Sequence, residues 1–306
     1  MKNDIDSLKK IYEDIETSDR LDEVINNAIL RGKIDMKKSN RKKGILKSIV
    51  GIAAAVGIFT VSINGIPSFA SKLEDVPVLG SLVKVLQFNE GKSQGGEITD
   101  GVNINKMFLQ KGKDSDSILI SFDSEHIEDT TPYFDVKYKE APYTMTFSVS
   151  GVRDFTARKY FDEIRSSQYV KDIYSVITLD DSQQRFNIVF NCPVTFEIEE
   201  YKNPSSIKVT ISEDTSKDSS HKIYSVRTNS YEKGEEFAMM EEILFEIDTL
   251  RVLKDKNRTF LYELGNYETE QEAIEKMEEL KNTYGESVKL LVEERTMEGL
   301  PSANSK

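Results

Sequence analysis

The sequence predicts a multi-domain protein with a short α-helical cytoplasmic segment, a single transmembrane helix, a β-sandwich-like domain and a C-terminal α+β domain. Three observations support this prediction. First, the 24 residues of Ser48–Ser71 carry no charge. Second, the charge changes sign across this block, from 12 Lys and Arg against 9 Asp and Glu before it to 29 against 44 after it. Third, the hydrophobic residues follow a helical period before the block and a period of two from about residue 97 onward.

The composition argues against several classes of function. The 306 residues have a formal net charge of −12, which is unfavourable for a dedicated nucleic-acid-binding protein. Cys192 is the only cysteine, which excludes an intramolecular disulfide and a cysteine-based zinc site. The sequence contains no Gly-rich phosphate loop, no H-E-x-x-H motif and no G-x-S-x-G motif. We therefore expect neither enzyme activity nor a cofactor.

The two histidines offer little further chemistry. His126 lies in the run SEHIED, where Glu125, Glu128 and Asp129 could in principle help to hold a metal ion. A run of this kind is more typical of a solvated acidic loop. His221 has no candidate ligands near it in the sequence. We therefore predict no metal site.

Residues 1–44 are predicted to form a cytoplasmic helical segment. Its second helix follows the N-cap pair Thr17-Ser18, ends near Gly32 and carries an apolar stripe at helical spacing, formed by Leu21, Val24, Ile25, Ala28 and Ile29. Two helices of about 12 residues cannot form much of a core. Their apolar faces need each other, a membrane surface or a protein partner. The first 23 residues hold eight acids, which an anionic membrane would repel, so we predict a partner with an apolar groove.

Residues 45–66 are predicted to form the transmembrane helix. The apolar run Ile49–Ile66 would span roughly 27 Å as a helix, against a hydrocarbon core of about 30 Å. Basic residues crowd its N-terminal side, which places the N-terminus in the cytoplasm and the rest of the chain outside the cell membrane. A buried core helix and a cleaved signal are the alternatives. Small residues at Ser68 and Ala70 make a candidate proteolytic site.

The remaining chain divides into four predicted parts. Residues 67–96 read as a juxtamembrane amphipathic element, with its apolar residues on one helical face, followed by the flexible linker NEGKSQGG. Residues 97–212 alternate apolar and polar positions, as in an antiparallel sandwich of six to eight strands with one helix near 157–165. Residues 221–295 follow the order β-α-β-β-α-β, which is typical of a ferredoxin-like domain, and Thr269 with Glu272 makes a capping box. Residues 296–306 are predicted to be a disordered tail.

The region from residue 15 to residue 90 resembles the RsiV-like, membrane-bound anti-sigma factors encoded beside extracytoplasmic-function sigma factors. The resemblance rests on LDEVINNAILRGK (Leu21–Lys33), the basic run, and the stretch INGIPSFASKLEDVPVLGSLVKVLQF (Ile63–Phe88). It implies that the cytoplasmic segment binds such a sigma factor. It also implies that a cut just outside the membrane, near Ser68 and Ala70, starts the release of that factor.

Two shorter resemblances concern the exported part. PVTFEIEEYKNPSSIKVTIS (Pro193–Ser212) is similar to the end of AMIN domains, which are β-sandwiches of cell-wall proteins. FLYELGNYETEQEAIEKMEELK (Phe260–Lys281) is similar to the second half of SPOR domains, which bind peptidoglycan. Together they imply a region that faces the cell envelope and has peptidoglycan or another envelope component as a ligand.

Two functions follow from these observations. The first is a membrane-anchored anti-sigma factor that senses the envelope through its exported domains. The alternative is a cell-wall-binding envelope protein with a passive cytoplasmic tail. The tail distinguishes them, because a passive anchor has no need for two amphipathic helices.

Overall fold

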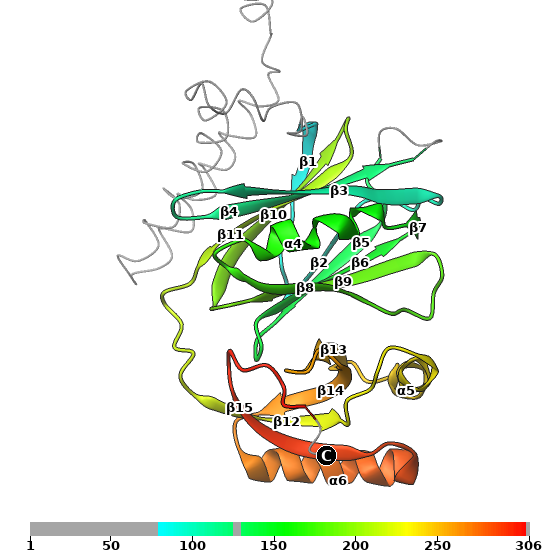
Figure 1. Ribbon diagram of the computed structural model, residues 1–306, viewed down its shortest axis with the longest axis vertical. Coiled ribbons are helices and arrows are strands. Elements are labelled where there is room, and N and C mark those ends of the chain that lie inside the picture. The colour runs from blue at the N-terminus through cyan, green and yellow to red at the C-terminus, as the bar shows by residue number, and fades with distance from the viewer. Residues whose placement is uncertain (1–78, 125–129, 304–306) are drawn as a thin grey trace, which may run out of the picture. The chain divides into compact units, whose positions relative to one another are not determined.

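A computed structural model describes residues 79–124 and 130–303, all within one compact unit, Val76–Lys306 (Figure 1). The unit is predominantly β, with fifteen strands in three sheets and three α-helices among the described residues. The predicted fold class is therefore wrong, because strands and not helices dominate the chain that is described. No helix in this part of the chain is long and apolar enough to cross a membrane. The predicted segments 1–44 and 45–66 lie outside the described residues.

The first sheet of the unit has six strands. Its order is β1 (Ser81–Val85), β10 (Val194–Lys202), β11 (Ser206–Glu213), β4 (Asp116–Asp123), β3 (Val102–Lys111) and β7 (Val152–Asp154). All neighbours are antiparallel except β3 and β7, which are parallel.

The second sheet has five antiparallel strands and packs against the first. Its order is β2 (Lys92–Gly95), β5 (Phe134–Lys139), β6 (Thr144–Ser150), β9 (Gln183–Phe190) and β8 (Val170–Val176). The apolar residues that alternate along these strands form one core with those of the first sheet. Phe147 and Phe186 stack in this core with their ring centroids 5.0 Å apart. A short 3-10 turn (Thr156–Tyr160) and α4 (Phe161–Arg165) pack beside β3 and β8.

Two segments of the predicted element and linker, residues 81–85 and 92–95, form strands. The run Ser81–Val85 forms strand β1, paired with β10, and not the predicted amphipathic element with a helical face. The predicted flexible linker contains strand β2, paired with β5. Gly95 serves close packing there, because a Cβ atom on it would lie 2.4 Å from the ring of Phe134. The apolar run that contains Ser81–Val85 is too short for the spacing of its residues to distinguish a helix from a strand. Strand β2 forms only by pairing with β5, which lies far along the chain.

The third sheet belongs to the C-terminal part. The chain runs through β12 (Lys222–Thr228), α5 (Glu235–Leu244), β13 (Arg251–Lys254), β14 (Phe260–Tyr267), α6 (Glu270–Tyr284) and β15 (Leu290–Thr296). The antiparallel strands lie in the order β13-β14-β12-β15, and α6 packs along β12 and β15 (Figure 1). At the start of α6, the Thr269 hydroxyl accepts from the Glu272 N–H, and the Glu272 carboxylate accepts from the Thr269 N–H.

The sandwich and the C-terminal part share a second core. Tyr174, Val176 and Val189 from β8 and β9 pack with apolar residues of α5, α6 and the third sheet. The segment after β15 is also held, because the Ser302 N–H donates to Glu293 over 2.6 Å and Pro301 is buried. The described residues of the predicted disordered tail, 296–303, are thus ordered by hydrogen bonds to neighbouring strands.

Candidate functional site

The predicted site residues all lie outside the described part of the chain. They are the apolar stripe Leu21, Val24, Ile25, Ala28 and Ile29, and the candidate proteolytic site Ser68 and Ala70. The acidic run around His126 is also outside it, since residues 125–129 are not described. Among the described residues, no three His, Cys, Asp or Glu side chains are grouped so that they could hold a metal ion.

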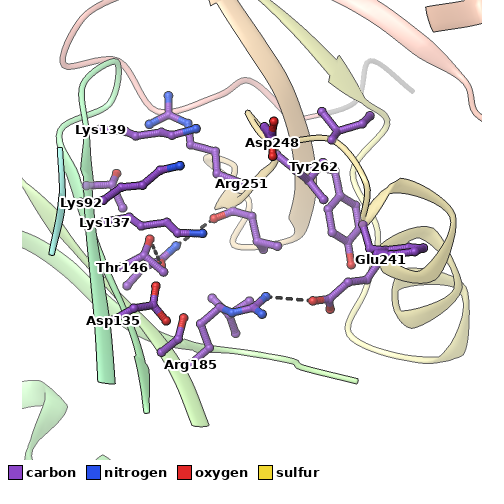
Figure 2. Close-up of a pocket in the computed structure, with 18 of the residues that line it drawn as sticks. Lys92, Asp135, Lys137, Lys139, Thr146, Arg185, Glu241, Asp248, Arg251 and Tyr262 are labelled. Atoms are coloured by element: carbon purple, nitrogen blue, oxygen red, sulfur yellow. Dashed lines mark hydrogen bonds and ion pairs between the residues drawn. The ribbon is translucent and has the colours of Figure 1, made fainter. Parts of the chain in front are cut away.

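A cavity of about 410 Å³ lies between the sandwich and the C-terminal part (Figure 2). One wall is the outer face of the five-stranded sheet. The other consists of α5, the loop that follows it, β13 and Tyr262 of β14. The volume is within the range of small-molecule sites, which occur preferentially at boundaries between domains.

The sheet wall consists of the polar residues that alternate with core residues along each strand. On β5, Phe134 and Val136 point into the sandwich core, so that Asp135, Lys137 and Lys139 face the cavity. On β6, Thr144, Thr146 and Ser148 face it in the same way. Figure 2 shows Lys92, Lys137 and Lys139 along this wall. The sequence signal for this wall is the run DVKYK, which places two lysines on one strand face of an acidic region.

The opposite wall carries the buried Glu241. This residue lies four positions after Phe237 and three before Leu244, so it shares the apolar face of α5 that packs into the second core. Its carboxylate reaches the cavity and accepts a hydrogen bond from Arg185 Nη1 of β9 over 2.8 Å. Sequence periodicity identifies Phe237 and Leu244 as core residues but gives no reason to single out a glutamate between them.

The cavity is locally basic although the chain is acidic. Five basic residues line it, Lys92, Lys137, Lys139, Arg185 and Arg251, against three acidic ones, Asp135, Glu241 and Asp248. Burial lowers the pKa of Lys139 to about 8, and the neighbouring guanidinium of Arg251 adds to this shift. Burial also raises the pKa of the Asp135 carboxyl above its usual value. Both shifts follow from the partial removal of these side chains from water.

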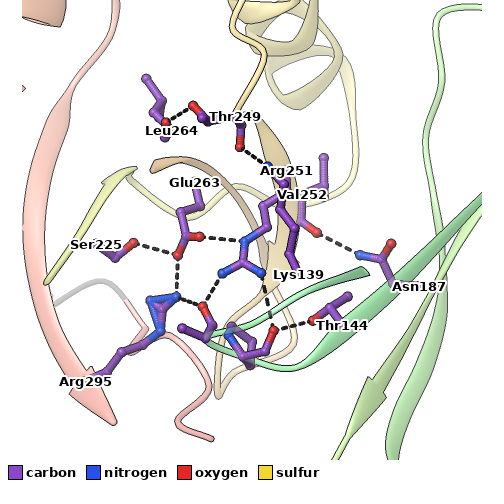
Figure 3. Close-up of polar contacts among 12 residues, drawn as sticks. Lys139, Thr144, Asn187, Ser225, Thr249, Arg251, Val252, Glu263, Leu264 and Arg295 are labelled. Carbon is purple, nitrogen blue, oxygen red and sulfur yellow. Dashed lines mark hydrogen bonds and ion pairs between the residues drawn. The ribbon is translucent and has the colours of Figure 1, made fainter. Parts of the chain in front are cut away.

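A buried ion network fixes the geometry of this boundary (Figure 3). Glu263 of β14 is 1% exposed. Its Oε1 lies 2.5 Å from Arg251 Nε, and its Oε2 accepts hydrogen bonds from Arg295 and from the Ser225 hydroxyl. Both arginines also donate to the carbonyl oxygen of Ala141, in the turn between β5 and β6. Burial alone would raise the pKa of Glu263, but the guanidinium groups of Arg251 and Arg295 outweigh this effect and hold the pKa below its usual value.

Further hydrogen bonds cross the boundary beside the network. Asn187 Nδ2 donates to the Val252 carbonyl over 2.8 Å, and Lys139 Nζ donates to the Thr249 carbonyl over 2.9 Å. The cavity walls are therefore preorganised by contacts on several sides.

No protein-family model, curated protein or solved structure matches this chain. The arrangement offers cations, hydroxyl groups and a buried carboxylate to a bound molecule, which suits binding by charge and hydrogen bonds.

Proposed function

We propose that this chain is an RsiV-like anti-sigma factor anchored in the cell membrane, with a cytoplasmic N-terminus and extracellular C-terminal domains. One observation carries the proposal. The amphipathic stripe of residues 21–29 stands directly before a basic run and the uncharged block Ser48–Ser71, and the chain is strongly acidic beyond that block. This order supports a partner-binding face on the cytoplasmic side of the membrane and the described unit on the opposite side.

The mechanism is steric. Leu21, Val24 and Ile25, with Ala28 and Ile29, cover an apolar groove of an extracytoplasmic-function sigma factor that RNA polymerase would otherwise use. The exported unit senses the cell envelope, with peptidoglycan or another envelope component as its ligand. The chain itself binds no nucleic acid and needs no cofactor.

The topology is tested by protease treatment of intact protoplasts that carry an epitope tag at residue 1. The unit from residue 76 onward should be degraded, because it lies outside, and the tag should survive because the membrane shields it. Lysed protoplasts provide the control, in which the tag is also lost. A tag that is cleaved in intact protoplasts would show that the N-terminus lies outside and would overturn the proposed anchor.

Release is proposed to begin with a cut near Ser68 and Ala70. Replacing Ala70 by Trp puts a bulky ring where signal peptidase accepts only small residues. We expect this variant to stay full-length under envelope stress and to keep the genes that depend on the sigma factor silent. The matched control is Ala70→Ser, which should be cut and should release normally. A normal stress response from Ala70→Trp would contradict the cleavage step and leave the anti-sigma assignment standing.

A further inference from the structure

The cavity between the sheet and α5 contains an excess of positive charge, with five basic side chains against three acidic ones. Lys92 of β2 and Lys137 of β5 stand directly opposite each other in the register of the two strands, so their side chains lie on the same face. Neither ammonium group makes a hydrogen bond or a close ion pair among the described residues, although the carboxylate of Asp135, on the same strand face, interacts electrostatically with Lys137. Like charges in this position repel each other, and an anion bound between them would remove the repulsion.

The other side of the cavity contains an unused acceptor. Glu241 is 7% exposed, and its Oε1 accepts from Arg185. Its Oε2 is buried and has no donor in the described part of the chain. Leaving a buried carboxylate oxygen without a hydrogen-bond donor is costly, so a molecule that fills the cavity gains affinity if it donates to Glu241 Oε2.

The remaining lining fits a hydroxylated molecule. Along the sheet wall, between the lysines and Arg185, the Thr146 hydroxyl donates to Asn187 Oδ1, so that its oxygen can still accept a hydrogen bond from a ligand hydroxyl, and Ser148 adds a second hydroxyl group. Phe245 and Ile247 supply a small apolar surface on the opposite wall. The cavity therefore combines a cationic end, a row of small polar groups and a buried acceptor, in a volume of about 410 Å³.

We propose that this cavity binds a small phosphate or carboxylate that also carries hydroxyl groups, such as a phosphorylated polyol. Its acid group lies between Lys92 and Lys137, and one of its hydroxyl groups donates to Glu241 Oε2. The bound molecule bridges the five-stranded sheet and α5. This site goes beyond the regulatory function proposed above.

The test is isothermal titration of the full-length chain, in mild detergent, with glycerol 3-phosphate and with propyl phosphate. Both probes carry the same phosphate, but only the first has hydroxyl groups. We expect glycerol 3-phosphate to bind at least about tenfold more tightly, because only it can donate to Glu241. Absence of binding of both probes at millimolar concentration would overturn the site, and equal affinities would overturn the role of Glu241.

Two variants test which side chains contribute to the affinity for the probes. Lys137→Gln should weaken both probes about tenfold or more, whereas Lys113→Gln, which removes a lysine from the exposed β3–β4 turn, should weaken neither. In Glu241→Gln the amide oxygen can keep the bond to Arg185, so that an NH₂ group replaces the free acceptor and the preference for glycerol 3-phosphate should disappear. Equal losses in Lys137→Gln and Lys113→Gln would show nonspecific charge attraction and contradict the site.

We expect Lys137→Gln to unfold at the same temperature as the wild type, because Lys137 is exposed. This result would confirm that the variant loses affinity without losing its fold. If this variant unfolds early, Lys137→Arg should restore both the stability and the phosphate affinity. No sigma factor is present in the titration, so a failure here and a failure of the regulatory proposal are separate results.

Discussion

Replacing Glu263 by Gln is expected to lower the free energy of unfolding of the described unit by about 3–5 kcal/mol. The substitution keeps the size of the side chain but leaves the guanidinium groups of Arg251 and Arg295 buried beside each other without their shared counter-charge. Urea unfolding followed by circular dichroism measures the change. The matched control is Glu294→Gln on β15, whose exposed carboxylate pairs at the surface with Lys222 and accepts from the Tyr224 hydroxyl, and we expect little change from it.

Glu263→Gln should also remove a pH dependence of the free energy of unfolding. The pKa of Glu263 is lowered in the folded state from its usual value of 4.5. As the pH falls below 4.5, the unfolded state therefore binds more protons than the folded state. The stabilisation is therefore complete above pH 4.5 and is lost as the pH falls through the lowered pKa. The difference in stability between the wild type and Glu263→Gln should shrink over this acidic range. A difference that stays constant, or an equally large loss in Glu294→Gln, would contradict the network's role.

Replacing both Val24 and Ile25 by Asp is expected to weaken binding of the sigma factor by at least about 100-fold. Two charges would enter an apolar contact without partners, which costs several kcal/mol in total. In the cell, the genes that depend on the sigma factor should be expressed without stress. The control Asn26→Asp with Asn27→Asp adds the same charge on positions outside the stripe and should leave them silent. Equal effects from both pairs would show that the face is assigned wrongly.

The sequence predicts local structure well where one period persists. The alternation Phe186, Ile188, Phe190 lies on strand β9, and the capping box at Thr269 begins α6 where the sequence places it. Such features depend on residues close together in the chain, and their physical cause is visible in a short window.

Long-range pairing is what the sequence does not reveal. The sandwich has eleven strands and not six to eight. Strand β1 lies in the run predicted as an amphipathic element, and β2 and β7 are short and polar and become strands only through their partners. The parallel pair of β3 and β7 carries no local signal. These strands therefore cannot be recognised before the fold is known.

The cavity and the ion network were missed for the same reason. Lys92, Lys137, Arg185 and Glu241 come from four distant segments, and each alone looks like an ordinary solvated charge. Glu263 stands in a strand that otherwise reads as apolar, and its counter-ions lie 12 and 32 residues away. A glutamate within the run FLYEL was the one available hint, since a charge in a buried strand requires a partner.

The most direct measurement of the central claim is a titration of residues 1–44 with each extracytoplasmic-function sigma factor of the same cell. The proposed function predicts that one of them binds with 1:1 stoichiometry and a Kd of about 1 μM or tighter, and that the double Asp variant at Val24 and Ile25 does not bind. Such a result would separate the regulator from a cell-wall-binding protein with a passive tail. Failure of every sigma factor to bind the wild-type segment would contradict the anti-sigma function.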